Sequence, residues 1–375
     1  MLEIIKNKST FSDQDLIRVV RRENNAKRNY LLVNSMQGKH VPANPDNVLK
    51  LYNELAKCLQ SEGNIKNAVF IGFAETATAV GAGVASCFEN SYYLHTTREV
   101  CTSRISVADF REEHSHATEQ LLYCDEWENI ISKAENIVFV EDEISTGKTI
   151  MNFINALKTQ KKVSDNIKFS ACSILNGMTE ECENGLRKQG MNFFYLVKHR
   201  ASPDSDEVYS FNPVIRLRKA DYDFTEIKIN GKINPRFGSE TAEYINACSS
   251  LADKISEMIS TEGKNVAVIG TEECMYPAIK TAQRISRAGV ASVVTHSTTR
   301  SPIVADNSED YPLKSRYQVE SFYDKERKTF IYNSDINRYD LVLVVTDSEK
   351  EDYDFTTLAD AFPLSEKFIL VRWVK

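Results

Sequence analysis

Acidic side chains stand directly before a turn suited to phosphate in the stretch IVFVEDEISTGKTI, residues 137–150. The apolar run ends in Glu141, Asp142 and Glu143. Backbone N–H groups and hydroxyls at the start of a helix bind phosphate well, whereas carboxylates repel it. A ligand that contacts both kinds of group must therefore carry a phosphate and, beside it, hydrogen-bond donors for the carboxylates. The turn consists of Ser145, Thr146, Gly147, Lys148 and Thr149.

A nucleoside-triphosphate loop does not fit this spacing. That loop follows the pattern G-x-x-x-x-G-K-[ST], and the position five residues before Gly147 is Asp142. In that loop the first glycine lets the backbone approach a β-phosphate closely. Asp142 has a carboxylate at this position, which would repel the phosphate. An ATPase P-loop is therefore disfavoured.

The stretch closely resembles the phosphoribosyl diphosphate (PRPP) motif of type I phosphoribosyltransferases. That resemblance implies that the 145–149 turn holds the 5′-phosphate. Glu141 and Asp142 would accept hydrogen bonds from the two ribose hydroxyls. Glu143 departs from the family pattern, which usually has an apolar residue there. The alternative is an ordinary strand that runs into a polar turn.

A second loop, FAETATAVG at 73–81, follows an apolar run and opens a stretch of small residues. The family's diphosphate-binding loop belongs at this place. We expect the backbone amides of Glu75, Thr76 and Ala77 to hold the diphosphate, with Mg²⁺ sharing its charge. The alternative is a strand-to-helix turn packed by alanines.

A long polar segment, TSRISVADFREEHSHATEQ, follows Arg98. Long loops inside compact domains are usually functional. In the family's fold this region often closes over PRPP and excludes water, so Arg98, His114 and His116 are catalytic candidates. A metal site is weakly indicated, because two histidines at i and i+2 face the same way only on a strand. A solvated loop is the alternative.

The sequence GKHVP at 38–42 joins a glycine to Lys39 and His40 before a proline. These two side chains are candidates for a hood over the acceptor substrate. An ordinary turn explains the same residues equally well.

Composition indicates a globular protein with small-molecule ligands. The chain has 375 residues, 42% of them hydrophobic, and a formal net charge of −7. That charge provides no broad attraction for nucleic acid or an anionic membrane. Its 8 cysteines include no Cys-x-x-Cys pair, and no apolar run reaches the roughly 20 residues of a membrane span. We therefore expect a cytoplasmic protein that binds neither membranes nor nucleic acid.

Apolar runs alternate with helical patterns, which predicts an α/β fold with mostly parallel sheets and helices on both faces. The strands expected first are 68–73, 91–97, 136–142, 168–175 and 192–199. A second series comprises 265–271, 291–299 and 339–347. Between them, 201–237 reads as a connector, and Ser239 is positioned to cap a helix. We predict a phosphoribosyltransferase domain at 1–234 and a second domain at 235–375.

The two series resemble each other. IGFAETATAVGAGVA is similar to IGTEECMYPAIKTAQ, LHTTRE to HSTTRS, and VFVEDE to VVTDSE. The second domain is therefore a candidate degenerate copy of the first.

The motifs together resemble the phosphoribosyltransferase subfamily with a C-terminal TRSP domain, named for residues such as Thr299-Arg300-Ser301-Pro302. Members are linked to tellurite-resistance and stress operons, with a proposed role in making a nucleoside-like metabolite. Candidate anion ligands in the second domain stand at expected strand ends, where ligands collect in open sheets. A surface Ser-Pro turn is the alternative. The candidates are Glu272, Glu273, Thr298, Thr299, Arg300 and Ser301.

These observations predict a Mg²⁺-dependent phosphoribosyltransferase that joins PRPP to a base-like acceptor. A regulatory protein that binds PRPP or a nucleotide without turnover is the main alternative. A ribose-phosphate diphosphokinase also pairs two such domains, but we find no residues for its ATP site. A homodimer is compatible with this interpretation.

Overall fold

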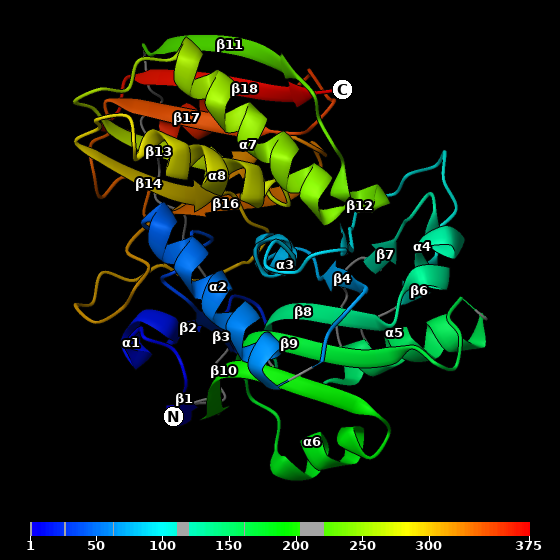
Figure 1. Ribbon diagram of the computed structural model, residues 1–375. Coiled ribbons are helices and arrows are strands. Elements are labelled where there is room, and N and C mark those ends of the chain that lie inside the picture. Colours follow the sequence, from blue (N-terminus) through cyan, green and yellow to red (C-terminus); the bar gives the residue numbers. More distant parts are fainter. Residues whose placement is uncertain (1, 26–27, 63, 111–119, 161, 203–220) are drawn as a thin grey trace.

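The computed structural model describes residues 2–375 except 26–27, 63, 111–119, 161 and 203–220. Two sheets form its framework, as Figure 1 shows. We call residues 2–201, which supply all but one strand of the first sheet, the N-terminal half. Residues 221–375, which supply the second sheet and one edge strand of the first, are the C-terminal half.

The sheet of the N-terminal half has 7 strands in the order β1-β10-β9-β8-β4-β5-β12. Its five central strands are parallel, and β1 and β12 are antiparallel edges. The bounds are β1 (Leu2–Asn7), β10 (Met191–Ala201), β9 (Lys168–Asn176), β8 (Asn136–Ile144), β4 (Ala68–Gly72), β5 (Tyr92–His95) and β12 (Ser239–Glu240).

Helices cover both faces of this sheet, as predicted. The strands are continuous apolar runs because both faces are buried. One face carries α2 (Pro45–Glu62) and α3 (Ala77–Ala85), and the other carries α4 (Trp127–Lys133) and α5 (Lys148–Thr159). The remaining elements are α1 (Asp13–Leu16), α6 (Glu180–Arg187) and two hairpins, β2 (Arg18–Arg21) with β3 (Tyr30–Val33) and β6 (Ala108–Phe110) with β7 (Gln120–Leu122).

The C-terminal half has a parallel sheet of 5 strands in the order β11-β18-β17-β13-β14. Its bounds are β11 (Asp223–Asn230), β18 (Lys367–Val374), β17 (Leu341–Thr346), β13 (Asn265–Gly270) and β14 (Ser292–Ser297). Helices α7 (Thr241–Met258) and α8 (Met275–Ile285) pack on one face. The other face carries α9 (Thr356–Asp360) and the hairpin of β15 (Arg316–Glu320) and β16 (Lys328–Tyr332).

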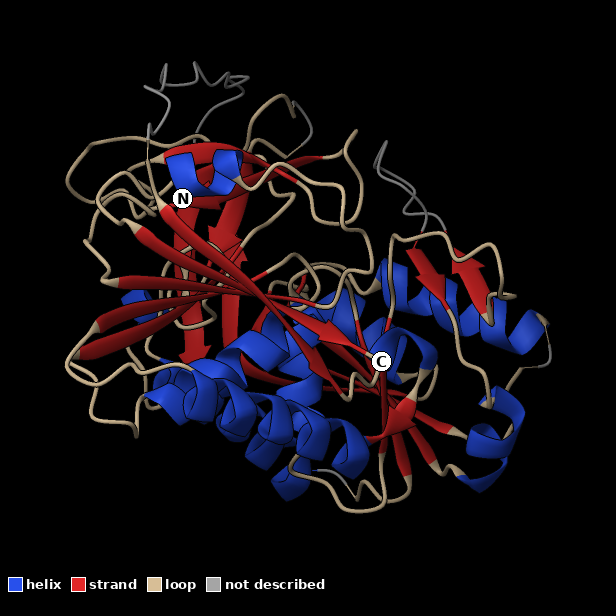
Figure 2. Cartoon of the chain, turned by 90° about the horizontal axis from the view of Figure 1, so that it is seen from above, coloured by secondary structure: helices blue, strands red, loops and turns tan. Residues whose placement is uncertain are grey.

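The two halves share one core. Apolar residues of α2, α3, α7 and α8 pack together with residues of both sheets. Helices α2 and α3 lie between the sheets in Figure 1. Figure 2 shows the helices, in blue, and the strands, in red, from above. The carboxyl ends of the central strands of each half are therefore held at fixed positions relative to the other half.

The chain between the halves differs from the expected connector. Residues 223–230 form β11, which pairs with β18, whereas Ser239 pairs with Tyr93 of β5 in the other sheet. Ser239 therefore does not cap α7, whose N-cap is Glu240. The short 3₁₀ helix η1 (Pro235–Phe237) lies between these strands. The division at 234/235 remains a prediction.

Strand order supports the predicted similarity of the halves. The four-strand orders β9-β8-β4-β5 and β18-β17-β13-β14 use strands in the same succession along the chain. Gly72 and Gly270 each end the strand before a helix, and a Cβ there would meet the carbonyl oxygens of Ala77 and Cys274, at 2.8 and 2.5 Å. The register pairs Gly72 with Val140 and Gly270 with Val345. Asp347 therefore corresponds to Asp142, one position away from the match that the sequence comparison gives.

Candidate active site

A cavity of about 300 Å³ lies at the carboxyl ends of β8, β4 and β5, where the two halves meet. Segments distant in sequence converge on it: the β2–β3 hairpin, the 38–42 turn, the loop after β4, the end of β8 and the last three residues of the TRSP motif. The predicted site residues among its lining are His40, Glu75, Thr76, Arg98, Glu141, Asp142, Arg300 and Ser301.

The PRPP-like stretch has the predicted local form. Glu141 and Asp142 lie near the end of β8, and α5 begins at Lys148 after the turn. Gly147 has a left-handed φ of 71°, which favours glycine. Ser145, Thr146 and Lys148 are exposed and Thr149 is half-buried, so the turn is accessible at the start of the helix.

Asp142 has a perturbed carboxyl group. Burial, together with the neighbouring Glu143 carboxylate, raises the pKa of Asp142 to about 6. Hydrogen bonds from the backbone and the charge of Arg28 oppose this rise. Asp142 therefore changes its charge close to neutral pH.

Glu143 has a partner that the sequence motifs do not indicate. Arg28 Nη2 donates to both carboxylate oxygens of Glu143 at 2.8 Å. The Arg28 guanidinium also lies over the ring of Tyr30, 4.8 Å from its centroid. Arg28 therefore balances the negative charge of Glu143, the residue that departs from the family pattern. The pair also connects the β2–β3 hairpin to β8.

The loop after β4 has some amides available for a ligand. Its Ala74–Glu75 peptide bond is cis. The amide of Ala77 donates to the Phe73 carbonyl at 3.1 Å, so it is already occupied, contrary to its predicted role in binding diphosphate. Within the part of the chain that the structure describes, the amides of Glu75 and Thr76 make no hydrogen bond.

The Glu75 side chain faces two cations. Lys39 Nζ lies 2.5 Å from Oε1 of Glu75, and Arg300 Nε lies 2.6 Å from Oε2. These cations outweigh the effect of burial and lower the pKa of Glu75 to about 2. The carboxylate is therefore ionised and balanced at neutral pH.

Lys39 is not positioned as a hood residue. Its side chain is fully buried, and Nζ also donates to the carbonyls of Glu272 at 2.8 Å and Thr298 at 3.0 Å. It links the halves and cannot reach an acceptor. His40, by contrast, lines the cavity, and its Nε2 is buried without a hydrogen-bond partner among the described residues. Burial lowers the pKa of His40 to about 3, so this imidazole is neutral at pH 7.

Arg98 lines the cavity, as its candidate role requires. Its Nε is buried without a hydrogen-bond partner in the described structure. His114 and His116, predicted with it, lie outside the described residues. Gln120 was missed by sequence reasoning; it lines the cavity and accepts a hydrogen bond from the Thr96 hydroxyl at 2.5 Å.

Arg300 does not form the open anion site expected of the second domain. Its guanidinium lies 2.6 Å from Glu75, 2.9 Å from Glu273 and 3.2 Å from Glu272. These carboxylates raise the pKa of Arg300 above its usual range despite burial. Glu272 and Glu273 are themselves buried and so are structural partners of the arginine.

The threonines of the TRSP motif are also engaged with the protein. The Thr298 hydroxyl accepts from the Glu272 amide at 3.0 Å, and Thr299 pairs with Phe330 of β16. Ser301 lines the cavity, and its amide donates to the Thr299 hydroxyl at 3.1 Å. Of these candidates, the structure brings only Arg300 and Ser301 to the cavity.

Arg236 is a further charged residue that the sequence did not single out. Its Nε donates to Glu273 at 2.8 Å, and Nη1 contacts Asp347, which also accepts from Tyr323. Asp347 therefore has protein partners where its counterpart Asp142 faces the cavity.

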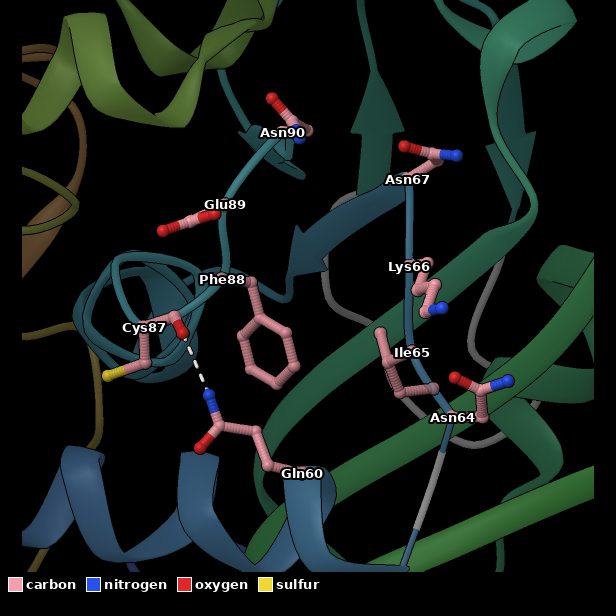
Figure 3. Close-up of a pocket in the computed structure, with 9 residues that line it drawn as sticks. All are labelled: Gln60, Asn64, Ile65, Lys66, Asn67, Cys87, Phe88, Glu89 and Asn90. Carbon is pink, nitrogen blue, oxygen red and sulfur yellow. Dashed lines mark hydrogen bonds between the residues drawn. The ribbon is translucent and has the colours of Figure 1, made fainter.

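A second hollow, shown in Figure 3, lies away from this site at the amino end of β4. It encloses about 580 Å³ between the end of α2 and the residues that follow α3. Gln60 donates to the Cys87 carbonyl across it at 2.8 Å. Its polar side chains are exposed, which is typical of a solvated surface.

Among the described residues, no group of three or more His, Cys, Asp and Glu is arranged to hold a metal ion, and no helix is long and apolar enough to cross a membrane.

Comparison with protein families assigns both parts of the chain. A phosphoribosyl transferase model matches residues 16–197, and a model of the TRSP domain that follows such a domain matches residues 234–362. The chain belongs to the phosphoribosyl transferase family that carries a C-terminal TRSP domain. By family, this phosphoribosyltransferase is a pentosyltransferase, as predicted. A search of curated proteins found no match.

Solved structures similar to this phosphoribosyltransferase cover about half of its chain. Adenine phosphoribosyltransferase of Giardia lamblia, complexed with 9-deazaadenine, is 13% identical, with 49% of this chain and 93% of that chain covered and a TM-score of 0.34. Orotate phosphoribosyltransferase of Aeropyrum pernix is 12% identical, with 49% and 89% covered and a TM-score of 0.30. The Trypanosoma brucei adenine enzyme, in complex with AMP, pyrophosphate and ribose-5-phosphate, is 12% identical, with 53% and 86% covered and a TM-score of 0.33.

Proposed function

We propose that this phosphoribosyltransferase transfers the 5-phosphoribosyl group of PRPP to a nitrogen of a base-like acceptor. One observation carries the proposal: Glu141 and Asp142 line the cavity at the end of β8, directly before the glycine turn that begins α5. The turn suits the 5′-phosphate and the acids suit the ribose hydroxyls.

The reaction breaks the bond between C1 of the ribose and the diphosphate oxygen, and forms a bond between C1 and the acceptor nitrogen. The electron pair of the broken bond leaves with diphosphate, and the acceptor nitrogen loses its proton to the released diphosphate or to water. The chain's own residues contribute position and charge. Glu141 and Asp142 orient the ribose, and their negative charges favour positive charge that develops on it.

Mg²⁺ is expected to arrive with the diphosphate. Carboxylate oxygens and substrate phosphates are the ligands that Mg²⁺ prefers, and the cavity offers the carboxylates of Glu141 and Asp142. When bound, this ion shares the charge of the leaving diphosphate. Arg98 lines the same cavity and is the protein's own cation for that charge.

The acceptor is proposed to lie beside His40. The unpartnered Nε2 of this neutral imidazole offers one hydrogen bond, as donor or acceptor according to tautomer. Leu31 and Leu32 add apolar surface to the lining. Such an environment suits a planar heterocycle, and the product would be a nucleotide or nucleoside-like metabolite. Its place in a stress or tellurite-resistance system follows from the family resemblance, and its cytoplasmic location follows from the cysteine pattern of the sequence. Both remain predictions.

The test is PRPP consumption by the purified chain with Mg²⁺ and a panel of heterocyclic bases, followed by diphosphate release. Release that depends on one base supports the transferase. PRPP binding without release under any condition would instead favour a regulatory PRPP-binding protein. Synthesis of PRPP from ATP and ribose 5-phosphate would indicate a diphosphokinase.

A further inference from the structure

The two halves repeat the same hydrogen bonds at the ends of their central strands. The amide of Thr96 donates to the Gly72 carbonyl at 2.9 Å, and the amide of Thr298 donates to the Gly270 carbonyl at 3.0 Å. Each threonine hydroxyl then accepts from the amide two residues after that glycine, at 2.8 and 3.0 Å. Thr96 and Thr298 are therefore equivalent positions.

The contacts between the halves are reciprocal. The equivalent threonines make Arg98 correspond to Arg300, and the glycines make Glu75 correspond to Glu273. The Arg98 amide donates to Glu273 at 3.4 Å, and the Arg300 amide donates to Glu75 at 3.4 Å. Exchange of the same contact in both directions is the geometry of a two-fold pair.

The edge strands follow the same exchange. Ser239, just before α7, pairs with Tyr93 of β5 in the N-terminal half. Ala43, just before α2, pairs with Thr295 of β14 in the C-terminal half. Each half therefore sends the segment before its long helix onto the edge of the other half's sheet, as two subunits of a dimer would.

The two halves differ in whether the carboxylates at their strand ends have protein partners. In the C-terminal half, Arg236 contacts both Glu273 and Asp347, so protein side chains satisfy the carboxylates there. In the N-terminal half, the corresponding position Asp142 lines the cavity. The arginine side chain that contacts Glu75 comes instead from the TRSP motif, as Arg300.

We propose that the TRSP domain acts as an internal second subunit without a substrate site at this edge of its sheet, and that its Arg300 is a positioning residue for diphosphate binding in the N-terminal half. The inference rests on the proposed function. Arg300 and Lys39 hold the Glu75 carboxylate from two directions. They thereby fix the loop whose Glu75 and Thr76 amides lie beside the cavity and make no hydrogen bond with any described residue.

Charge gives the second reason for this role. An ionised Glu75 without cations would repel a diphosphate bound to its own loop. Lys39 balances it from within the protein core, and Arg300 balances it at the cavity wall. Loss of Arg300 therefore both frees the loop and exposes the negative charge, which affects diphosphate far more than the 5′-phosphate bound at the 145–149 turn.

The experiment compares two part-ligands of PRPP by calorimetry: inorganic diphosphate with Mg²⁺, and ribose 5-phosphate. The proteins are the full-length wild type, Arg300→Gln, Arg300→Lys and Arg327→Gln. Arg327 is the matched control, because its side chain is 15% exposed, against 13% for Arg300, and it pairs with Glu272 and Glu99 without contacting Glu75. Thermal unfolding verifies that each variant is folded.

We expect Arg300→Gln to weaken diphosphate binding at least tenfold and ribose 5-phosphate binding less than twofold. Arg300→Lys keeps the charge and should recover part of the loss, whereas Arg327→Gln should change neither ligand more than twofold. Each ligand should bind with one site per chain. Equal loss of both ligands, no loss of diphosphate, or two sites per chain would overturn the inference. Wild-type protein that binds neither ligand would instead overturn the proposed function, and the inference with it.

Discussion

Arg300 of the TRSP motif places its Nε 2.6 Å from the carboxylate of Glu75, which lies in the loop after β4 of the other half. This ion pair is mostly buried, with 13% and 9% of the two side chains exposed. It gives the motif a role outside its own domain. The cavity therefore depends on both halves, and its behaviour should respond to residues far from the PRPP-like stretch in sequence.

Replacement of Lys39 by methionine should destabilise the protein by about 3 kcal/mol. The change leaves the buried Glu75 with one cation instead of two, and removal of one partner from a buried charge pair is costly. Chemical denaturation measures the loss. Lys228→Met is the control. Its pair with Glu351 has side chains 53% and 70% exposed, so loss of this pair should change stability far less than loss of Lys39. Similar losses in both variants would contradict the assigned role of Lys39.

Gly147→Ala should weaken PRPP binding at least tenfold. The position has a φ of +71°, which strains any residue with a Cβ, and the added Cβ would lie 2.7 Å from Leu186 Cδ1, so the 145–149 turn or the Leu186 side chain has to shift. Gly263→Ala introduces the same kind of strain at φ +70° with no atom within 4 Å. Each variant should lose about 1 kcal/mol or more of stability. Only Gly147→Ala should lose PRPP affinity, and equal affinities would exclude the turn as the phosphate site.

PRPP affinity should fall as the pH drops through about 6, where Asp142 takes up a proton. A protonated carboxyl accepts fewer hydrogen bonds from the ribose hydroxyls. Titrations from about pH 5 to about pH 8, a range that spans the raised pKa of Asp142, measure this dependence. Asp142→Asn experiences the same titration of the ligand phosphates, so the difference between the two profiles isolates Asp142. Parallel profiles would show that this carboxylate does not bind the ligand.

The same substitution should change stability in a pH-dependent way. Burial raises the folded-state pKa of Asp142 from 3.8 to about 6, so the carboxylate destabilises the fold fully above that value and not at all below the unfolded value. Asp142→Asn should therefore raise stability at alkaline pH, by up to about 3 kcal/mol, and leave it nearly unchanged at acid pH. A stabilisation that is largest at acid pH would reverse the sign and contradict the assignment.

Arg28 and Glu143 should behave as a coupled pair. Their 2.8 Å contact joins the β2–β3 hairpin to β8, and the side chains are 30% and 15% exposed. A double-mutant cycle with Arg28→Met and Glu143→Met should give a coupling free energy of about 1 kcal/mol in denaturation experiments. Additive losses would mean that Glu143 is not held by Arg28.

Local sequence predicted those parts of the fold that depend on local pattern. Continuous apolar runs located β4, β8 and β9, because parallel strands buried on both faces leave no other pattern. The position of Glu141 and Asp142 at the cavity followed from a strand end beside a turn that suits phosphate. Each of these features lies within one short segment of the chain.

Features that depend on pairing between distant segments were missed. Arg236 and Arg28 receive their roles from Glu273 and Glu143, and no nearby residue marks either arginine. Lys39 has a sequence context typical of an exposed turn, yet its side chain is buried by contact with the C-terminal half, where it donates to the carbonyls of Glu272 and Thr298. A comparison of the two halves was the one available signal, because it already placed Arg98 and Arg300 at equivalent points.

Calorimetric titration of PRPP, with Mg²⁺, into the wild type and the Glu141→Ala/Asp142→Ala variant tests the central claim most directly. The acids line the cavity but take no part in the Lys39 and Arg300 contacts, so the variant should remain folded. We predict saturable binding to the wild type and a loss of at least a hundredfold in the variant. Absence of wild-type binding, or equal binding by a folded variant, would contradict the account.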